Sequence, residues 1–342
     1  PSRFVLHPFF TGAGAQDGMG HWRSLIKCPS LAAIRMKRFV SENPVLAFVI
    51  LTLGMQFAIV WVVGHYLSVL PEGARIHDSE EAHMVFRFRA FGPLLFAVLL
   101  TAWLEGREGL KNLFGAFLNW RVHPKWYVLA FSWKFLFTYV GIAVVFALGI
   151  SGWPGWGAGT GPEGLGHALE GMVSNLPFII GIAFVEETAW MKFCVTRMQQ
   201  RYGALVSSAL VGVAWGLWYL PMLLIREGVP DGYPWHMFLL SMIALTIFLS
   251  WTYNMTRSGV ILLIMQIVSN CAFFIIPVLP AWFHGDAIYI NAFVTVNIIT
   301  ATSIVFIFGP KNLANRERAR WDEHMPGKER RPDESPVEAI SA

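Results

Sequence analysis

Two adjacent carboxylates interrupt an apolar stretch of the chain that reads Phe178-Ile-Ile-Gly-Ile-Ala-Phe-Val-Glu186-Glu187-Thr-Ala-Trp190-Met191. The residues before the pair carry no charge, as in a transmembrane helix. A charged side chain at the centre of such a helix costs about 2.5–3.5 kcal/mol even on the mildest insertion scales. We therefore expect Glu186 and Glu187 to face the interior of a helix bundle, away from lipid.

The composition of the whole chain indicates an integral membrane protein. Of its 342 residues 55% are hydrophobic and only 14% are charged, and the mean hydropathy is +0.50. Soluble domains carry about a quarter charged residues, so a soluble fold is excluded. A bilayer core of about 30 Å requires about 20 apolar residues in a helix. The sequence therefore predicts an all-α, polytopic membrane helix bundle.

Eight stretches are long and apolar enough to be predicted as spans. They are Val45–Leu70, Phe86–Leu104, Trp126–Ile150, Met172–Phe193, Ala204–Ile225, His236–Tyr253, Gly259–Leu279 and Ala287–Phe308. With these spans, most Lys and Arg residues fall on the side of the N-terminus, and the opposite loops hold only Arg75, Arg87, Arg89 and Arg226. Positive residues concentrate in cytoplasmic loops, so we expect both termini in the cytoplasm. The expected location is a bacterial inner (cytoplasmic) membrane.

Two polar segments flank the predicted membrane domain, residues 45–309. In the N-terminal segment, residues 1–44, His21–Val40 is basic with interspersed apolar residues. It predicts either a helix on the membrane surface, starting near Pro29-Ser30, or a solvated basic tail. Residues 1–20 lack a basic segment followed by an apolar core, so we expect no signal peptide there. The charged cytoplasmic tail, residues 310–342, contains Pro and Ser and both charge signs, a composition typical of disorder unless a partner subunit orders it.

Polar residues of three predicted spans fall at similar depths in the membrane. At about 1.5 Å per residue, Glu186 lies roughly 20 Å below the outer boundary and Tyr219 roughly 20 Å above the cytoplasmic one. Gln266 and Asn270 fall in the same region and, being four residues apart, share one helix face. We therefore expect Glu186, Tyr219, Gln266 and Asn270 to meet near the bilayer midplane.

Three motifs in these spans resemble a known family. They are Glu186-Glu187-Thr-Ala-Trp190-Met191 with Arg197-Met-Gln-Gln-Arg201-Tyr-Gly203, then Trp215-Gly-Leu-Trp218-Tyr219-Leu-Pro221, then Ser258-Gly259-Val-Ile-Leu-Leu-Ile-Met-Gln266-Ile-Val-Ser-Asn270. Their order and spacing are similar to the CPBP family, the CAAX-prenyl-protease-like or abortive-infection-type intramembrane metalloproteases. The resemblance covers roughly residues 172–274. It implies an eight-helix fold and an ancestral endopeptidase site.

The motifs depart from the family pattern at three positions. The family's Glu-Glu is followed after three residues by Arg, where this chain has Met191. Its second motif ends in His, where Tyr219 stands, and its third begins with His, where Gln266 stands. By the resemblance, Glu186 would be the general base on a water molecule, with Glu187 beside it, and Asn270 would assist at the oxyanion.

The lost histidines bear on both metal binding and proton transfer. Tyr and Gln are poor ligands for divalent metals compared with neutral imidazole. A neutral amide also cannot accept a proton at working pH. We therefore expect no divalent metal and no other cofactor. The carboxylates can instead be structural, held by Tyr219, Gln266 or Asn270 in a hydrogen-bonded network.

Three functions remain open on the sequence alone. The first is a noncatalytic membrane subunit or scaffold, a pseudoenzyme that binds a partner membrane protein or lipid. The second is an unusual CAAX-type intramembrane endopeptidase that uses Glu186. The third is a proton-coupled transporter using the carboxylate pair, for which the chain lacks a clear inverted repeat. We expect the lipid bilayer and partner membrane proteins, and no nucleic acid, as partners.

Overall fold

A computed structural model describes residues 31–161, 163–229, 232–279 and 286–323 of the chain. These residues form helices and connecting turns and contain no strand. The chain divides into two units, residues 1–43 and the remainder from Pro44. The all-α, polytopic fold predicted from the sequence is confirmed.

The described part of the first unit is one helix, α1 (Leu31–Glu42). Arg38 pairs with Glu42 one turn later at 2.8 Å, and the predicted start of the helix near Pro29-Ser30 lies outside the described residues. Residues 21–30 of the predicted surface helix lie outside the described residues. Its position at a membrane surface stays a prediction.

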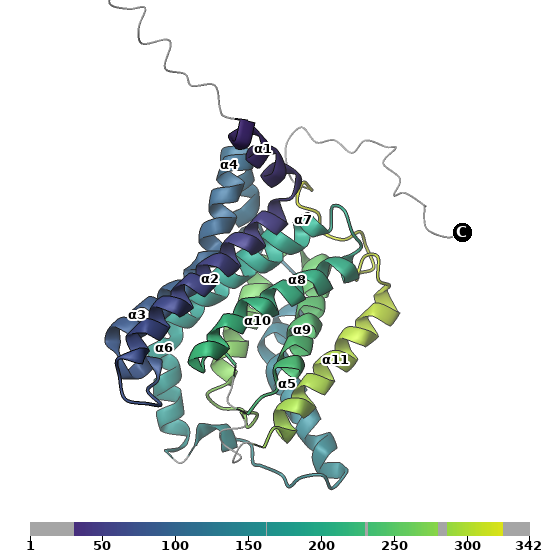
Figure 1. Cartoon of the computed structure of the whole chain (residues 1–342). Coiled ribbons are helices and arrows are strands. Elements are labelled where there is room, and N and C mark those ends of the chain that lie inside the picture. Colours follow the sequence, from purple (N-terminus) through teal and green to yellow (C-terminus); the bar gives the residue numbers. More distant parts are fainter. Residues whose placement is uncertain (1–30, 162, 230–231, 280–285, 324–342) are drawn as a thin grey trace, which may run out of the picture. The chain divides into compact units, whose positions relative to one another are not determined.

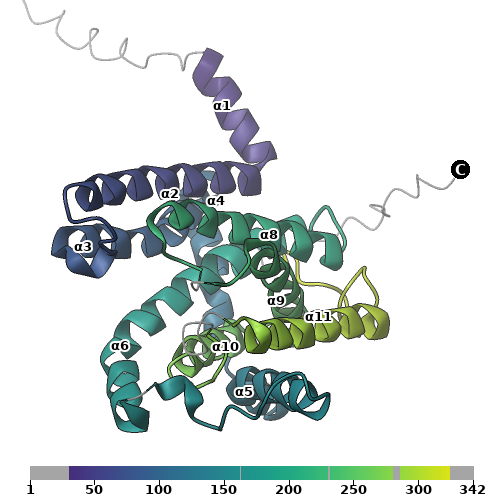
Figure 2. The same ribbon diagram turned by 60° about the horizontal axis from the view of Figure 1, so that its bottom comes forward.

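Figures 1 and 2 show the second unit as a bundle of long helices. The long elements are α2 (Pro44–Ser68), α4 (Gly92–Gly115), α5 (Lys125–Ala147), α6 (Gly164–Glu186), α8 (Ala204–Tyr219), α9 (Trp235–Thr256), α10 (Gly259–Ala272) and α11 (Ile288–Phe308). The short elements are η1 (Ile76–Asp78), α3 (Glu80–Phe88), η2 (Arg89–Phe91), η3 (Ala116–Leu118), η4 (Ala158–Thr160), η5 (Glu187–Val195), α7 (Thr196–Met198) and η6 (Leu220–Ile225).

Seven continuous helical stretches of the described residues are long and apolar enough to cross a membrane. They are Pro44–Ser68, Glu80–Leu118, Lys125–Ala147, Gly164–Met198, Ala204–Ile225, Trp235–Thr256 and Ile288–Phe308. These correspond to seven of the eight predicted spans. The remaining one, predicted over 259–279, forms a helix that ends at Ala272 and has only 14 residues. At about 1.5 Å per residue, α10 is too short to cross the bilayer by itself.

Small residues let two pairs of helices pack closely. A Cβ atom at Gly212 of α8 would lie 2.8 Å from the Cα atom of Ile243 in α9. A Cβ atom at Gly141 of α5 would lie 2.9 Å from the backbone of Ala292 in α11. Both separations are shorter than ordinary contacts, so glycine is required there. Close backbone approach through small residues is the usual way in which membrane helices associate.

The helix α4 has a kink at Gly106, whose backbone angles are φ 60° and ψ −144°. Residues with a Cβ atom rarely adopt this region, so the break depends on glycine. The preceding residue is Glu105, which therefore ends the first half of α4. This second predicted span also extends beyond its predicted limits, over Glu80–Leu118.

The first part of the C-terminal tail is ordered by contacts within the chain. The carbonyl groups of Pro310 and Lys311 accept hydrogen bonds from the backbone N–H groups of Leu205 and Ala204, at 3.0 and 2.9 Å. They thereby satisfy two donors at the start of α8, whose N-cap residue is a glycine with no side chain to do so. Ala319 donates its backbone N–H to the side chain of Asn254 at 2.9 Å. In contrast to the disorder expected from composition, residues 312–323 make defined contacts with the rest of the chain. The expected partner subunit stays a prediction.

Candidate functional site

The two carboxylates lie at a change of helix type. The α-helix α6 ends at Glu186, and the next nine residues, Glu187–Val195, form the π-helix η5. Such helices are rare and are frequently found at functional sites. All nine residues of η5 are buried. The carboxylate pair therefore sits on an unusual and tightly enclosed segment.

Aromatic packing holds η5 in place. The ring of Trp190 stacks on Trp215 of α8 with centroids 5.8 Å apart and an interplanar angle of 11°. On another side it contacts Phe48 of α2 edge-on at 5.2 Å. Aromatic pairs at such distances contribute about 0.5–1.5 kcal/mol each beyond the area that they bury. The π-helix is thus fixed against two neighbouring helices.

Glu186 accepts hydrogen bonds on both of its carboxylate oxygens. The Tyr219 hydroxyl at the end of α8 donates to Oε1 at 3.3 Å. The Gln266 amide on α10 donates from Nε2 to Oε2 at 2.6 Å. The side chain of Glu186 is buried, so both donors replace water that it has lost. The sequence predicts a hydrogen-bonded network around Glu186. The structure contains this network between α6, α8 and α10, with Tyr219 and Gln266 as donors.

Asn270 does not join this network. It is half-buried on α10, one turn beyond Gln266, and makes no hydrogen bond to either carboxylate among the described residues. Met191, at the position of the family's arginine, is fully buried within η5. Of the predicted site residues, Tyr219 and Gln266 donate hydrogen bonds to Glu186. Asn270 and Met191 make no polar contact to it among the described residues.

Glu187 lies in a different environment from Glu186. It is fully buried, and neither of its carboxylate oxygens has a hydrogen-bond partner among the described residues. A buried polar group without a hydrogen-bond partner is energetically costly. The pair therefore combines one hydrogen-bonded carboxylate and one unpaired carboxyl group.

Arg89 is a site residue that the sequence interpretation missed. It lies near the start of the predicted second span, and the structure places it in η2 within that span. Its guanidinium group lies over the ring of Phe86 at 4.0 Å and over that of Trp218 at 5.2 Å. Its charge interacts with those of Glu186 and Glu227. The sequence does contain a signal for this residue, because an arginine at the margin of a weakly apolar span, next to aromatic residues, indicates a buried cation.

A second polar cluster lies at the other end of η5, which we call the Trp321 cluster. It consists of Glu105, Asn112, Lys192, Arg197 and Trp321. The tail residue Trp321 donates its indole N–H to the carboxylate of Glu105 at 2.8 Å and 2.9 Å. Its ring lies 3.8 Å from the Arg197 guanidinium, which pairs with Glu105 at 2.9 Å.

The same cluster supplies a hydrogen-bond acceptor to the buried ammonium group of Lys192 in η5. Lys192 donates to the side chain of Asn112 at 3.1 Å, and Asn112 donates to the backbone carbonyl of Trp321 at 2.5 Å. The backbone N–H of Trp321 in turn donates to Thr196 at 3.1 Å. The helix η5 therefore connects the carboxylate pair at its start to the Trp321 cluster at its end.

The groups around Glu186 lack the imidazoles that suit a zinc-type site. Its oxygens receive hydrogen bonds from a phenol and an amide, which are poor ligands for such an ion compared with neutral imidazole. No group of three or more His, Cys, Asp or Glu side chains placed to hold a metal occurs in the part of the chain that the structure describes.

Replacing Gln266 is expected to destabilise the bundle. In Gln266→Leu, the Oε2 atom of Glu186 loses its only amide donor, and an unsatisfied buried acceptor costs about 1–3 kcal/mol. The control is Asn270→Leu, which replaces a second amide side chain by Leu on the same helix without removing a hydrogen bond to Glu186. The free energy of unfolding, measured by titrating mixed micelles with SDS, should fall clearly more for Gln266→Leu. Equal losses would contradict the assigned hydrogen bond.

The comparison with protein families gives one match. Residues 169–272 match the family described as Type II CAAX prenyl endopeptidase Rce1-like. The match contains the carboxylate pair, Tyr219, Gln266 and Asn270, and confirms the resemblance to CAAX-protease-like membrane proteins. No curated protein is similar enough to the chain to be matched.

Proposed function

We propose that this Rce1-like, multi-pass membrane protein is a noncatalytic membrane subunit or scaffold that binds a partner membrane protein or lipid. In this proposal the protease site has degenerated, and its carboxylates now hold helices together. It requires no divalent metal or other cofactor.

The hydrogen bonding of Glu186 carries this proposal. A carboxylate offers about four lone-pair sites, two on each oxygen. Here Tyr219 and Gln266 each donate to one carboxylate oxygen of Glu186 and so occupy one site on each. These contacts stabilise the carboxylate in its present position and compete with water for its oxygens. A buried polar network that holds helices together requires such hydrogen bonds between them.

A specific observation favours the second candidate, a retained CAAX-type endopeptidase. Glu187 is buried on a π-helix and has no hydrogen-bond partner in the described part of the chain, and local conflicts of this kind concentrate at functional sites. In that reading Glu186 is the base, Tyr219 and Gln266 position it, and Asn270 assists the oxyanion. The two candidates predict opposite results when Glu186 is replaced.

We expect Glu186→Gln to leave the function of the protein intact. Gln keeps the size of the side chain and one oxygen acceptor, and the Gln266 amide can turn to accept from the new N–H₂ group. The full-length protein in proteoliposomes should not cleave a membrane-tethered prenylated peptide. After extraction in mild detergent, wild type and Glu186→Gln should copurify with the same stoichiometric partner.

Two results would count against the proposal. Peptide cleavage that is abolished by Glu186→Ala and Glu186→Gln would establish the endopeptidase instead. A partner-free monomer after mild extraction, with no cleavage, would remove the scaffold function. Glu187→Gln serves as the matched control, because it changes the neighbouring carboxyl group without removing either donor of Glu186.

A further inference from the structure

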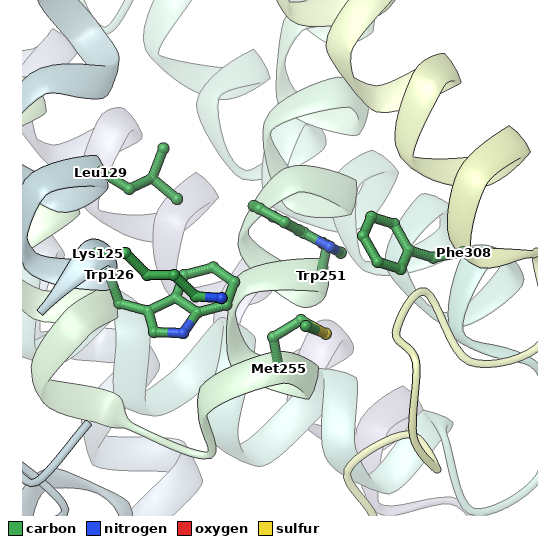
Figure 3. A pocket seen from close by; sticks show the side chains of 6 residues that line it. All are labelled: Lys125, Trp126, Leu129, Trp251, Met255 and Phe308. Atoms are coloured by element: carbon green, nitrogen blue, oxygen red, sulfur yellow. The ribbon is translucent and has the colours of Figure 1, made fainter. Parts of the chain in front are cut away.

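An aromatic pocket lies at one end of the bundle, away from the carboxylate pair. It has a volume of about 300 Å³ and is lined by Lys125, Trp126, Leu129, Trp251, Met255 and Phe308. Figure 3 shows these side chains converging from three helices. Ring contacts fix the walls, because Trp251 packs on Trp126 at 5.1 Å and on Phe308 at 5.8 Å.

The pocket lies where the three helices begin or end. Lys125 is the first residue of α5, Met255 is the last but one of α9, and Phe308 is the last of α11. All three helices are candidate membrane spans, so their ends mark one face of the membrane domain. By the distribution of Lys and Arg, this is the face predicted to be cytoplasmic.

Two cations lie in or next to this pocket, Lys125 in its lining and Arg316 at the end of α9. Lys125 is exposed, and its ammonium lies 5.6 Å from the ring of Trp126, with no ion pair among the described residues. The exposed tail residue Arg316 donates to the backbone carbonyl groups of Asn254 and Met255, which brings a second cation to the end of α9. The nearby Glu323 is already paired with Arg257 at 3.0 Å.

We propose that this pocket binds an anionic phospholipid of the adjoining leaflet, with part of an acyl chain between the aromatic walls and the phosphodiester near Lys125 and Arg316. The apolar lining complements an acyl chain, and the unpaired positive rim complements the phosphate. Basic pockets between transmembrane helices at the cytoplasmic side are typical sites for such headgroups. This inference does not rest on the function proposed for the carboxylate pair.

The apolar lining of the pocket favours a lipid over a free anion. Most of the pocket surface is contributed by aromatic and aliphatic side chains, which offer an inorganic phosphate ion no hydrogen bonds. A zwitterionic lipid supplies the chain but carries a compensating positive charge next to its phosphate. The pocket should therefore prefer an anionic lipid over a zwitterionic lipid with the same chains.

The test uses delipidated full-length protein in detergent, titrated with dioleoyl phosphatidylglycerol or dioleoyl phosphatidylcholine and followed by native mass spectrometry. Each lysine near an anionic membrane surface contributes about 1 kcal/mol, so Lys125→Gln should weaken phosphatidylglycerol binding about fivefold. Met255→Trp should weaken binding of both lipids by filling the pocket. The control, Lys111→Gln, removes an exposed lysine that already pairs with Glu108 at 2.6 Å and should leave binding unchanged.

Competition with inorganic phosphate and a comparison of the variants separate lipid binding from simple anion binding and from general surface charge. An excess of inorganic phosphate should not displace the bound lipid, and displacement would indicate a simple anion site. Equal effects of Lys125→Gln and Lys111→Gln would show that only general surface charge is involved, which would overturn the proposal. So would phosphatidylglycerol binding unaffected by both Lys125→Gln and Met255→Trp. Size-exclusion chromatography and circular dichroism verify that each variant is folded.

Discussion

The Trp321→Ala variant is expected to lose about 3–5 kcal/mol of the free energy of unfolding, the usual cost of truncating a buried tryptophan. Trp321 is almost fully buried although it belongs to a charged tail. The substitution removes the indole donor to Glu105 and the ring beneath Arg197, and it leaves a cavity between α4 and η5. SDS titration of the purified protein in mixed micelles measures the change.

Two further variants show whether the indole itself matters. Trp321→Phe keeps most of the ring but removes the donor to Glu105, so it should lose clearly less than Trp321→Ala. Trp61→Ala truncates a side chain that is 77% exposed and should change stability by less than about 0.5 kcal/mol. If Trp321→Ala proved as mild as Trp61→Ala, the docking of the tail described here would be wrong.

Removing the buried cation of the same cluster is expected to have an effect of similar size. In Arg197→Met, Glu105 loses its ion pair and keeps only the indole donor. Breaking a buried pair by removing one partner costs about 3–5 kcal/mol, because the remaining charge stays buried. Glu105 is 20% exposed, so the lower end of this range is expected. The same SDS titration measures the loss.

A double-mutant cycle identifies the cause of that loss. Glu105→Gln removes the charge that Arg197→Met leaves unpaired, while the amide oxygen can still accept from Trp321. The double variant should therefore be more stable than the sum of the two single losses predicts, by about 0.5–3 kcal/mol. Simple additivity would show that Arg197 and Glu105 do not act as a pair.

The sequence predicted those features that depend on local composition. Apolar stretches of about 20 residues located seven spans, because the bilayer imposes a length on every crossing helix. The calculated depth of each polar residue along its span correctly predicted that Tyr219 and Gln266 lie next to Glu186. This worked because a rise of about 1.5 Å per residue is the same for all three helices.

Features that depend on contacts between distant segments could not be predicted in this way. The charged composition around Trp321 is typical of disorder, yet one aromatic side chain that docks in the cluster overrides it. Arg89 stands at the start of the predicted second span, and hydropathy alone does not show that two rings cover its guanidinium group. The π-helix at Glu187 leaves no pattern in the sequence, since no order of residue types distinguishes its wider hydrogen bonding from that of an α-helix.

The shortness of α10 has a consequence for how the protein is made. A helix of 14 residues offers the insertion machinery too little apolar length to be retained as a span by itself. It follows α9 after a tight connection at Arg257-Ser258, and it packs against α5, α6 and α9. We infer that α9 and α10 enter the bilayer together as a hairpin. Gln266 then reaches Glu186 only after the earlier helices are in place, so this hydrogen bond forms late in biogenesis.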